Sequence, residues 1–210
     1  VRGATPWRAG RTLEALVPQP VEGMAPLVIS PLSHLALAAA DHDAAAGAAL
    51  AEAYPTRLAE VGALLGLEAL PAALPHLRPA PFDRPPATLD AATRLSLALG
   101  CLSARAAAMA PADASSAWSA LDLVALYAQD LRADGRLDGL AAGAPARLPA
   151  GEAGSVALAP DPVRTGLALA CMDWLHHPRN QQGLAEAAAT GWIQGLRARA
   201  DSPLLDPAQA

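Results

Sequence analysis

The sequence predicts an all-α protein, built as an irregular helical bundle or as stacked helical hairpins, with six to eight helices. Alanine and leucine dominate the 210 residues, and both are strong helix formers. Aromatic residues make up only 3% of the chain, lysine is absent, and phenylalanine occurs once, at Phe82. Because residues that favour strands are scarce, we expect helices that pack through a core of small side chains.

Caps and prolines divide the first half of the chain into helices. Ser30-Pro31 predicts a helix start, since serine caps helix N-termini and proline suits the first turn. We expect this helix to end at Asp41-His42-Asp43, and a second helix beginning at Asp43 to end at Pro55. Thr56 then caps a third helix with apolar residues at helical spacing. The segment 75–86 is too rich in proline to form any helix.

The second half carries the same kinds of signal. The helix starts expected here are, in order, Thr88 or Asp90, Asp113 or Ser115, Asp161 and Asn180. Met109 lies at the end of the first of these helices, Gly135 ends the second, and Pro178 bounds the third. Residues 139–160 are rich in Gly, Ala and Pro, so we expect a loop there.

These signals predict three parts: an extended N-terminal arm (1–30), a single helical domain (31–200) and a C-terminal tail (201–210). The proline-rich segment 75–86 is a candidate sub-division of the domain. Arg94 to Cys101 and Arg164 to Cys171 share Arg, Leu-Ala-Leu and Cys in register. This match favours either an internal repeat of helical hairpins or chance similarity in an alanine- and leucine-rich chain.

Charge and hydropathy exclude several classes of partner. The net charge is −5, and 15 arginines are scattered among 20 acidic residues, so we expect no nucleic-acid partner. No apolar run reaches the length of a membrane span, and no secretory signal is visible. We therefore expect a cytoplasmic protein. A surface rich in alanine is compatible with a homo-oligomer.

The two cysteines, Cys101 and Cys171, each lie in an apolar run. Cysteine in such a run behaves as a small hydrophobic residue, so buried reduced thiols are the first expectation. A disulfide between them is the alternative that the sequence leaves open.

The polar stretch after residue 173 is the strongest candidate for a ligand site. Its histidines also suit the negative end of a helix dipole, which requires no ligand. As a binding site, it would offer hydrogen-bonding side chains and an arginine for an anion. The candidate ligand-binding residues are Trp174, His176, His177, Arg179 and Asn180.

Other polar groups predict no chemistry. Asp41-His42-Asp43, with His34 nearby, contains metal-ligand types, but helix capping and solvation explain the triplet. The glutamates lack the Glu-x-x-His pairs of a di-iron bundle. Cysteines in apolar helices make poor nucleophiles. We expect no catalytic residues, no metal and no cofactor.

The function predicted from these features is non-enzymatic protein–protein interaction, as an adaptor, chaperone or assembly accessory factor. Trp7, Arg8 and Arg11 are the candidate partner-binding residues, because tryptophan and arginine are enriched where proteins meet. The alternative is a helical small-molecule-binding domain or enzyme, with its pocket near Trp174.

Overall fold

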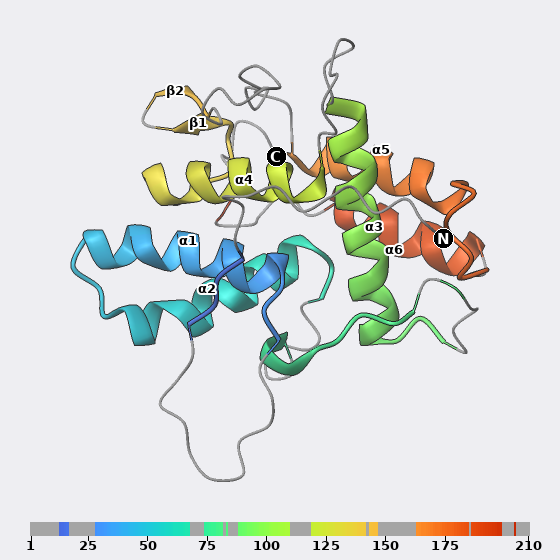
Figure 1. Cartoon of the computed structure of the whole chain (residues 1–210), viewed down its shortest axis with the longest axis horizontal. Coiled ribbons are helices and arrows are strands. Elements are labelled where there is room, and N and C mark those ends of the chain that lie inside the picture. Colours follow the sequence, from blue (N-terminus) through green and yellow to red (C-terminus); the bar gives the residue numbers. More distant parts are fainter. Residues whose placement is uncertain are drawn as a thin grey trace, which may run out of the picture.

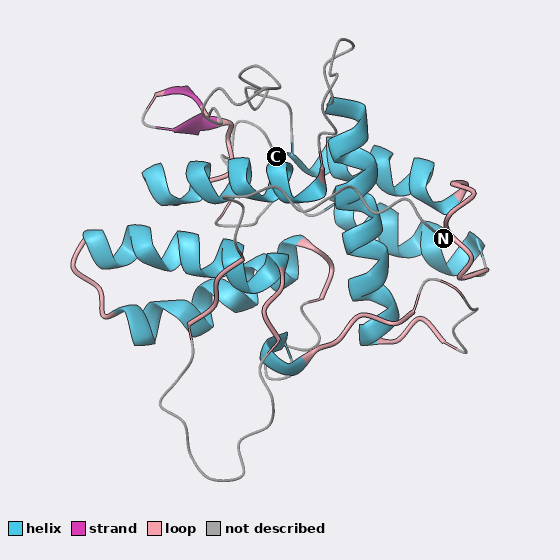
Figure 2. Ribbon diagram, viewed as in Figure 1, coloured by secondary structure: helices cyan, strands magenta, loops and turns pink. Residues whose placement is uncertain are grey.

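The computed structural model describes residues 13–16, 28–67, 74–81, 83, 88–109, 119–141, 143–146, 163–184, 186–198 and 204. These residues form six α-helices, so the predicted all-α fold is confirmed (Figure 1). The helices are α1 (Pro31–Ala45), α2 (Leu50–Leu64), α3 (Ala91–Met109), α4 (Ala120–Asp134), α5 (Val163–Leu175) and α6 (Glu186–Ala198). Figure 2 shows how little else is regular: the 3-10 turn η1 (Leu74–His76) and an antiparallel hairpin of β1 (Leu140–Ala141) and β2 (Ala144–Pro145).

The helices pack as a bundle of pairs. α1 packs against both α2 and α4, α3 packs against α4 and α5, and α5 packs against α6. In Figure 1 the α1–α2 hairpin lies below α4, and α3 runs steeply across α5 and α6. Among the described residues, no helix has the length and apolar character that a membrane span requires.

Small side chains let α1 contact two helices at once. Ala36, Ala38, Ala39 and Ala40 of this helix are completely buried. An alanine face brings neighbouring backbones close together, and leucines of the neighbouring helices fill the remaining space. The predicted small-residue packing is therefore present along α1, whereas leucines make up most of the remaining core.

Helix α1 continues through the cluster at which it was expected to end. Asp41-His42-Asp43 lies inside the helix, which runs to Ala45. Asp43 accepts hydrogen bonds of 2.7 and 2.6 Å from Nε and Nη2 of Arg57 in α2. This pairing across the hairpin holds Asp43 in the last turn of α1, where it cannot cap a second helix.

Helix α2 is continuous where the sequence predicts two helices separated at Pro55. Pro55 lies in its second turn, and both Pro55 and Ala51, four residues earlier, are exposed. The Ala51 carbonyl that loses its usual N–H partner therefore faces water rather than the core. Tyr54, Leu58 and Val61 pack inward on both sides of the proline, so tertiary packing outweighs the local break.

Several other predicted helix boundaries are confirmed, and the helix start expected at Asn180 is wrong. Ser30 caps α1, Asp90 accepts a 2.8 Å hydrogen bond from the Thr93 N–H, and Gly135 ends α4 with φ +78°. Helix α4 begins after a capping box of Ser119 and Asp122; the expected caps Asp113 and Ser115 lie outside the described residues. Helix α6 begins at Glu186, later than the expected Asn180.

Two segments outside the helices are tied to the bundle. In the proline-rich segment, the Ala80 carbonyl accepts a 2.6 Å hydrogen bond from Oγ of Ser96 in α3. Leu204, within the expected tail, is fully buried, and its carbonyl accepts a 2.6 Å hydrogen bond from the Leu137 N–H. The hairpin of β1 and β2 occupies the start of the region expected to be a loop.

Candidate functional site

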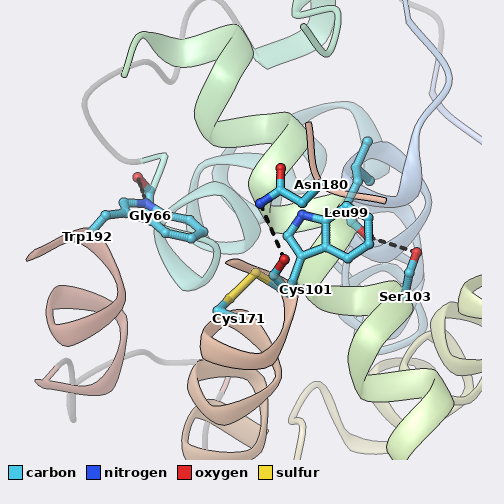
Figure 3. The surroundings of a disulfide bond; sticks show 8 residues. Gly66, Leu99, Cys101, Ser103, Cys171, Asn180 and Trp192 are labelled. Atoms are coloured by element: carbon cyan, nitrogen blue, oxygen red, sulfur yellow. Dashed lines mark hydrogen bonds between the residues drawn. A yellow bond between two sulfur atoms is a disulfide. The ribbon is translucent and has the colours of Figure 1, made fainter. Parts of the chain in front are cut away.

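A disulfide bond joins α3 to α5. Cys101 and Cys171 are bonded with their Cα atoms 4.4 Å apart, and both residues are 1% exposed (Figure 3). The expectation of two reduced thiols is wrong, because the packing of α3 on α5 brings two apolar helix faces together at their cysteines. The bond closes a separation of 70 residues. Loop closure of that length stabilises the folded state by about 4 kcal/mol in the chain-entropy model.

Glycines allow the close approach of α3 and α5 around this bond. A Cβ atom added at Gly100 would overlap the indole of Trp174, and one added at Gly166 would overlap the guanidinium of Arg105. The two contacts lie on either side of the disulfide along the paired helices. Each helix therefore accepts a large side chain of the other in a space that glycine leaves open.

Three of the predicted ligand-binding residues form the C-terminal cap of α5. The Trp174 ring stacks on His177 with centroids 5.3 Å apart and an interplanar angle of 16°. The Asn180 side-chain amide donates to the carbonyl oxygens of Trp174 and Leu175, at 3.3 and 3.4 Å. Asn180 therefore caps the end of α5 rather than the start of α6. The exposed Arg179 contributes its backbone N–H, which donates to Nδ1 of His177 at 3.1 Å.

A hollow of about 200 Å³ lies beside this cap. Its lining residues are Leu175, His176, Asn180, Gly183 and Leu184. Two of the five predicted ligand-binding residues, His176 and Asn180, are among them. The hollow has the volume for a small molecule of a few heavy atoms, and among its described lining residues His176 and Asn180 carry polar side chains.

Gln182, one of the hydrogen-bonding side chains expected at a binding site in this polar stretch, instead anchors the loop beside the hollow. Gln182 is 0% exposed, and its Nε2 donates to the Pro81 carbonyl at 3.4 Å. Its Oε1 is buried and has no hydrogen-bond partner among the described residues. This contact connects the loop after α5 to the proline-rich segment before α3.

The other polar clusters hold helices together. Arg132 of α4 contacts Asp41 of α1 at 3.1 Å and Glu14 at 3.0 Å. The buried His34 accepts a hydrogen bond at Nδ1 from the Glu14 N–H. Burial, and then the charge of Arg132, lower the pKa of His34. Within the described ranges, no three metal-ligating side chains come together.

Asp130 is a buried carboxyl group in α4 that the sequence analysis missed. It is 0% exposed, and its Oδ2 accepts a 2.9 Å hydrogen bond from the Gly139 N–H. Its Oδ1 is buried and accepts no hydrogen bond from a described residue. Burial, together with the charges of Asp138 and Asp134, raises the pKa of Asp130 to about 7. The loop that follows α4 is thus folded over a carboxyl group that favours its neutral form.

The outer face of α5 exposes a large apolar side chain. Leu169 is 61% exposed, although Leu167 and Cys171 on either side of it are buried. Asp173 and His176 follow at four and seven residues, so they share the outward face of the helix. Ile29, just before α1, is the other large apolar residue that the described chain exposes, at 59%.

The predicted partner-binding residues Trp7, Arg8 and Arg11 lie outside the described residues. Comparison with protein families, with curated proteins and with solved structures finds no match for this chain. The geometry of the described residues therefore carries the functional proposal.

Gly100→Ala should destabilise the protein by about 1–3 kcal/mol, because the added methyl group forces the Trp174 indole away from α3. Gly191→Ala is the matched control, since a Cβ at this position in α6 meets nothing within 4 Å. The control should gain about 0.5–1 kcal/mol from helix propensity. Urea unfolding measures both changes, and a gain in both variants would contradict the close approach.

The free energy of unfolding should fall as the pH rises from about 4 to about 7. The pKa of Asp130 is about 7 in the folded protein against 3.8 for a free side chain. In this range the folded chain therefore keeps a proton that the unfolded chain has released, and raising the pH removes that advantage. The full effect is on the order of 4 kcal/mol.

Asp130→Asn should remove the contribution of Asp130 to this slope in urea unfolding measured across the same pH range. His34 contributes an opposite slope, because its lowered pKa favours folding at higher pH. That contribution is common to both proteins, so their difference isolates Asp130. Asp173→Asn, at an exposed position, is the control. An unchanged slope in Asp130→Asn would refute the assignment.

Proposed function

We propose that this chain is a non-enzymatic interaction protein whose partner docks on the outer face of α5. The observation that carries the proposal is Leu169, 61% exposed on a helix that a disulfide holds firmly on its opposite side. A rigid helix face with an apolar centre and a polar border is typical of a docking surface. The partner is a protein with a complementary apolar surface. A second copy of this chain is one such protein.

The disulfide supports a place of action outside a reducing cytoplasm. Disulfides persist in oxidising compartments and are rare where thiols are kept reduced. The expected cytoplasmic location rested on the lack of a visible targeting signal, which is weaker support than a buried bond between two helices. We therefore propose that the protein meets its partner in an oxidising compartment.

Site-specific crosslinking tests the proposed surface. A photoreactive side chain at position 169 should give a discrete adduct in the producing cells, and mass spectrometry identifies the adduct as another protein or as a dimer. The same group at Ala107, exposed on α3, is the matched control and should give none. Equal adducts at both positions, or none at 169, would exclude the surface.

Leu169→Asp should weaken binding of the identified partner at least about tenfold, because burial of a leucine contributes about 1.5–3 kcal/mol. The variant should unfold within about 0.5 kcal/mol of the parent, since the side chain is exposed. Ala107→Asp should leave both the affinity and the stability unchanged. Isothermal titration calorimetry measures the affinities.

A second candidate function is binding of a small molecule in the hollow beside the α5 cap. The observation that favours it is the hollow itself, about 200 Å³ and lined by His176 and Asn180. The imidazole of His176 suits a small polar metabolite bearing a carboxylate or a hydroxyl group, while the Asn180 amide stays bonded to the end of α5. This site would serve an enzyme or a binding domain equally well.

His176→Ala separates binding from stability in this hollow. We expect a bound metabolite to raise the melting temperature of the parent by several degrees and to have no effect on the variant. Without ligand, both should melt together, because His176 is exposed. Asp173→Ala, one turn earlier and outside the lining, should respond like the parent. A metabolite that stabilises the His176→Ala variant equally would remove this candidate.

A further inference from the structure

The Cys101–Cys171 bond is inaccessible in the folded protein. Both residues are 1% exposed, in the middle of the helices α3 and α5 that enclose them. Thiol–disulfide exchange begins when a thiolate attacks one sulfur of the bond, so it requires direct access to that sulfur. Neither a reductant nor an oxidising enzyme has this access while α5 lies on α3.

Close contacts on both sides of the bond leave no room for a partial opening. The Trp174 indole occupies the space at Gly100, and the Arg105 guanidinium occupies the space at Gly166. Exposure of either sulfur would require α5 to move away from α3 along most of its length. If α6, which packs on α5, moved with it, the hydrogen bond from Trp192 of α6 to the Gly66 carbonyl would also break.

We propose that the bond is made on the incompletely folded chain by a disulfide-carrying oxidant and is then sealed when α5 packs onto α3. The bond is therefore a permanent lock acquired during maturation rather than a reversible redox switch. The class of reaction that must act on the newly made chain is dithiol oxidation, carried out by a thiol oxidase of an oxidising compartment.

The proposed step balances as two successive exchanges. The thiolate of one cysteine attacks the oxidant's disulfide, which forms a mixed disulfide and releases one thiolate of the oxidant. The second cysteine then attacks the mixed disulfide, which forms the Cys101–Cys171 bond and releases the other thiolate. Two electrons pass from the cysteines to the oxidant, whose thiolates take up the two protons. The chain has two cysteines, so no rearrangement between intramolecular pairings is needed.

Reduction kinetics test whether the bond is sealed. Oxidised protein is treated with dithiothreitol, and free thiols are trapped at intervals with a maleimide that adds mass. Reduction should be at least about 100-fold slower in native buffer than in denaturing urea, because it must wait for opening of the α3–α5 contact. Similar rates in the two conditions would show an accessible bond and overturn the lock.

The order of events is tested by refolding the reduced chain with oxidised glutathione as the probe. The oxidant is added either at the start of refolding or after the reduced chain has regained its helical circular dichroism. Late addition should oxidise the cysteines at least about tenfold more slowly, because packing of α5 then limits access. Equal rates in a chain that has regained native hydrogen-exchange protection would refute the proposed order.

A cysteine-free variant, Cys101→Ser with Cys171→Ser, shows whether the helices pack without the bond. If both this variant and Cys101→Ala with Cys171→Ala, which buries no hydroxyl group, stay unfolded, packing requires the bond, as proposed. If either variant folds, the oxidation rates after early and late addition of oxidised glutathione show whether the bond forms before α5 packs on α3. Neither experiment depends on Leu169, so their results test this proposal separately from the proposed docking surface.

Discussion

A disulfide and close side-chain contacts hold α3 and α5 together, and the rest of the C-terminal half depends on this constraint. The disulfide fixes one point of contact, and glycines at two others admit a tryptophan and an arginine from the opposite helix. Together they set the distance and the angle of α5. Helix α6 packs on α5, and its Trp192 donates to the carbonyl of Gly66, in the turn after α2, at 3.4 Å (Figure 3). The position of α5 therefore also affects how α6 contacts this turn.

The contact between α3 and α5 also gives α5 two different faces. Its inner face is committed to the bond and to the Trp174 contact, and its C-terminus is closed by Asn180 and His177. Its outer face is left with Leu169 at the centre and polar residues beyond it. A helix that cannot rotate or slide presents this face in one orientation. Pre-organisation of that kind reduces the ordering cost of binding.

Polar side chains in this protein mainly hold the backbone in place. The pairs Asp43–Arg57 and Asp41–Arg132 clamp α1 to its two neighbours, and Gln182 ties a loop to the proline-rich segment. The fully buried alanine face of α1 buries little area per residue, so such specific contacts help to select one packing among several similar ones. Asp130 is the costly exception, since its buried carboxyl group resists ionisation.

The sequence by itself determined the helical class, because the helix propensity of alanine and leucine is informative when summed over segments as long as these. It also determined the boundaries that rest on local chemistry, at Ser30, Asp90 and Gly135. The matching positions of Cys101 and Cys171 in two similar apolar helices were a signal for the disulfide, but spacing along a chain does not say which helix faces meet.

Only the tertiary structure decided the remaining features. Helix α2 passes through Pro55 because inward packing on both sides outweighs one lost hydrogen bond. The polar stretch after residue 173 became a helix cap with a hollow beside it because the loop folds back on α5. Leu169 faces outward because the disulfide holds the opposite side of α5 against α3. Each of these depends on contacts between residues distant in sequence, which local patterns do not encode.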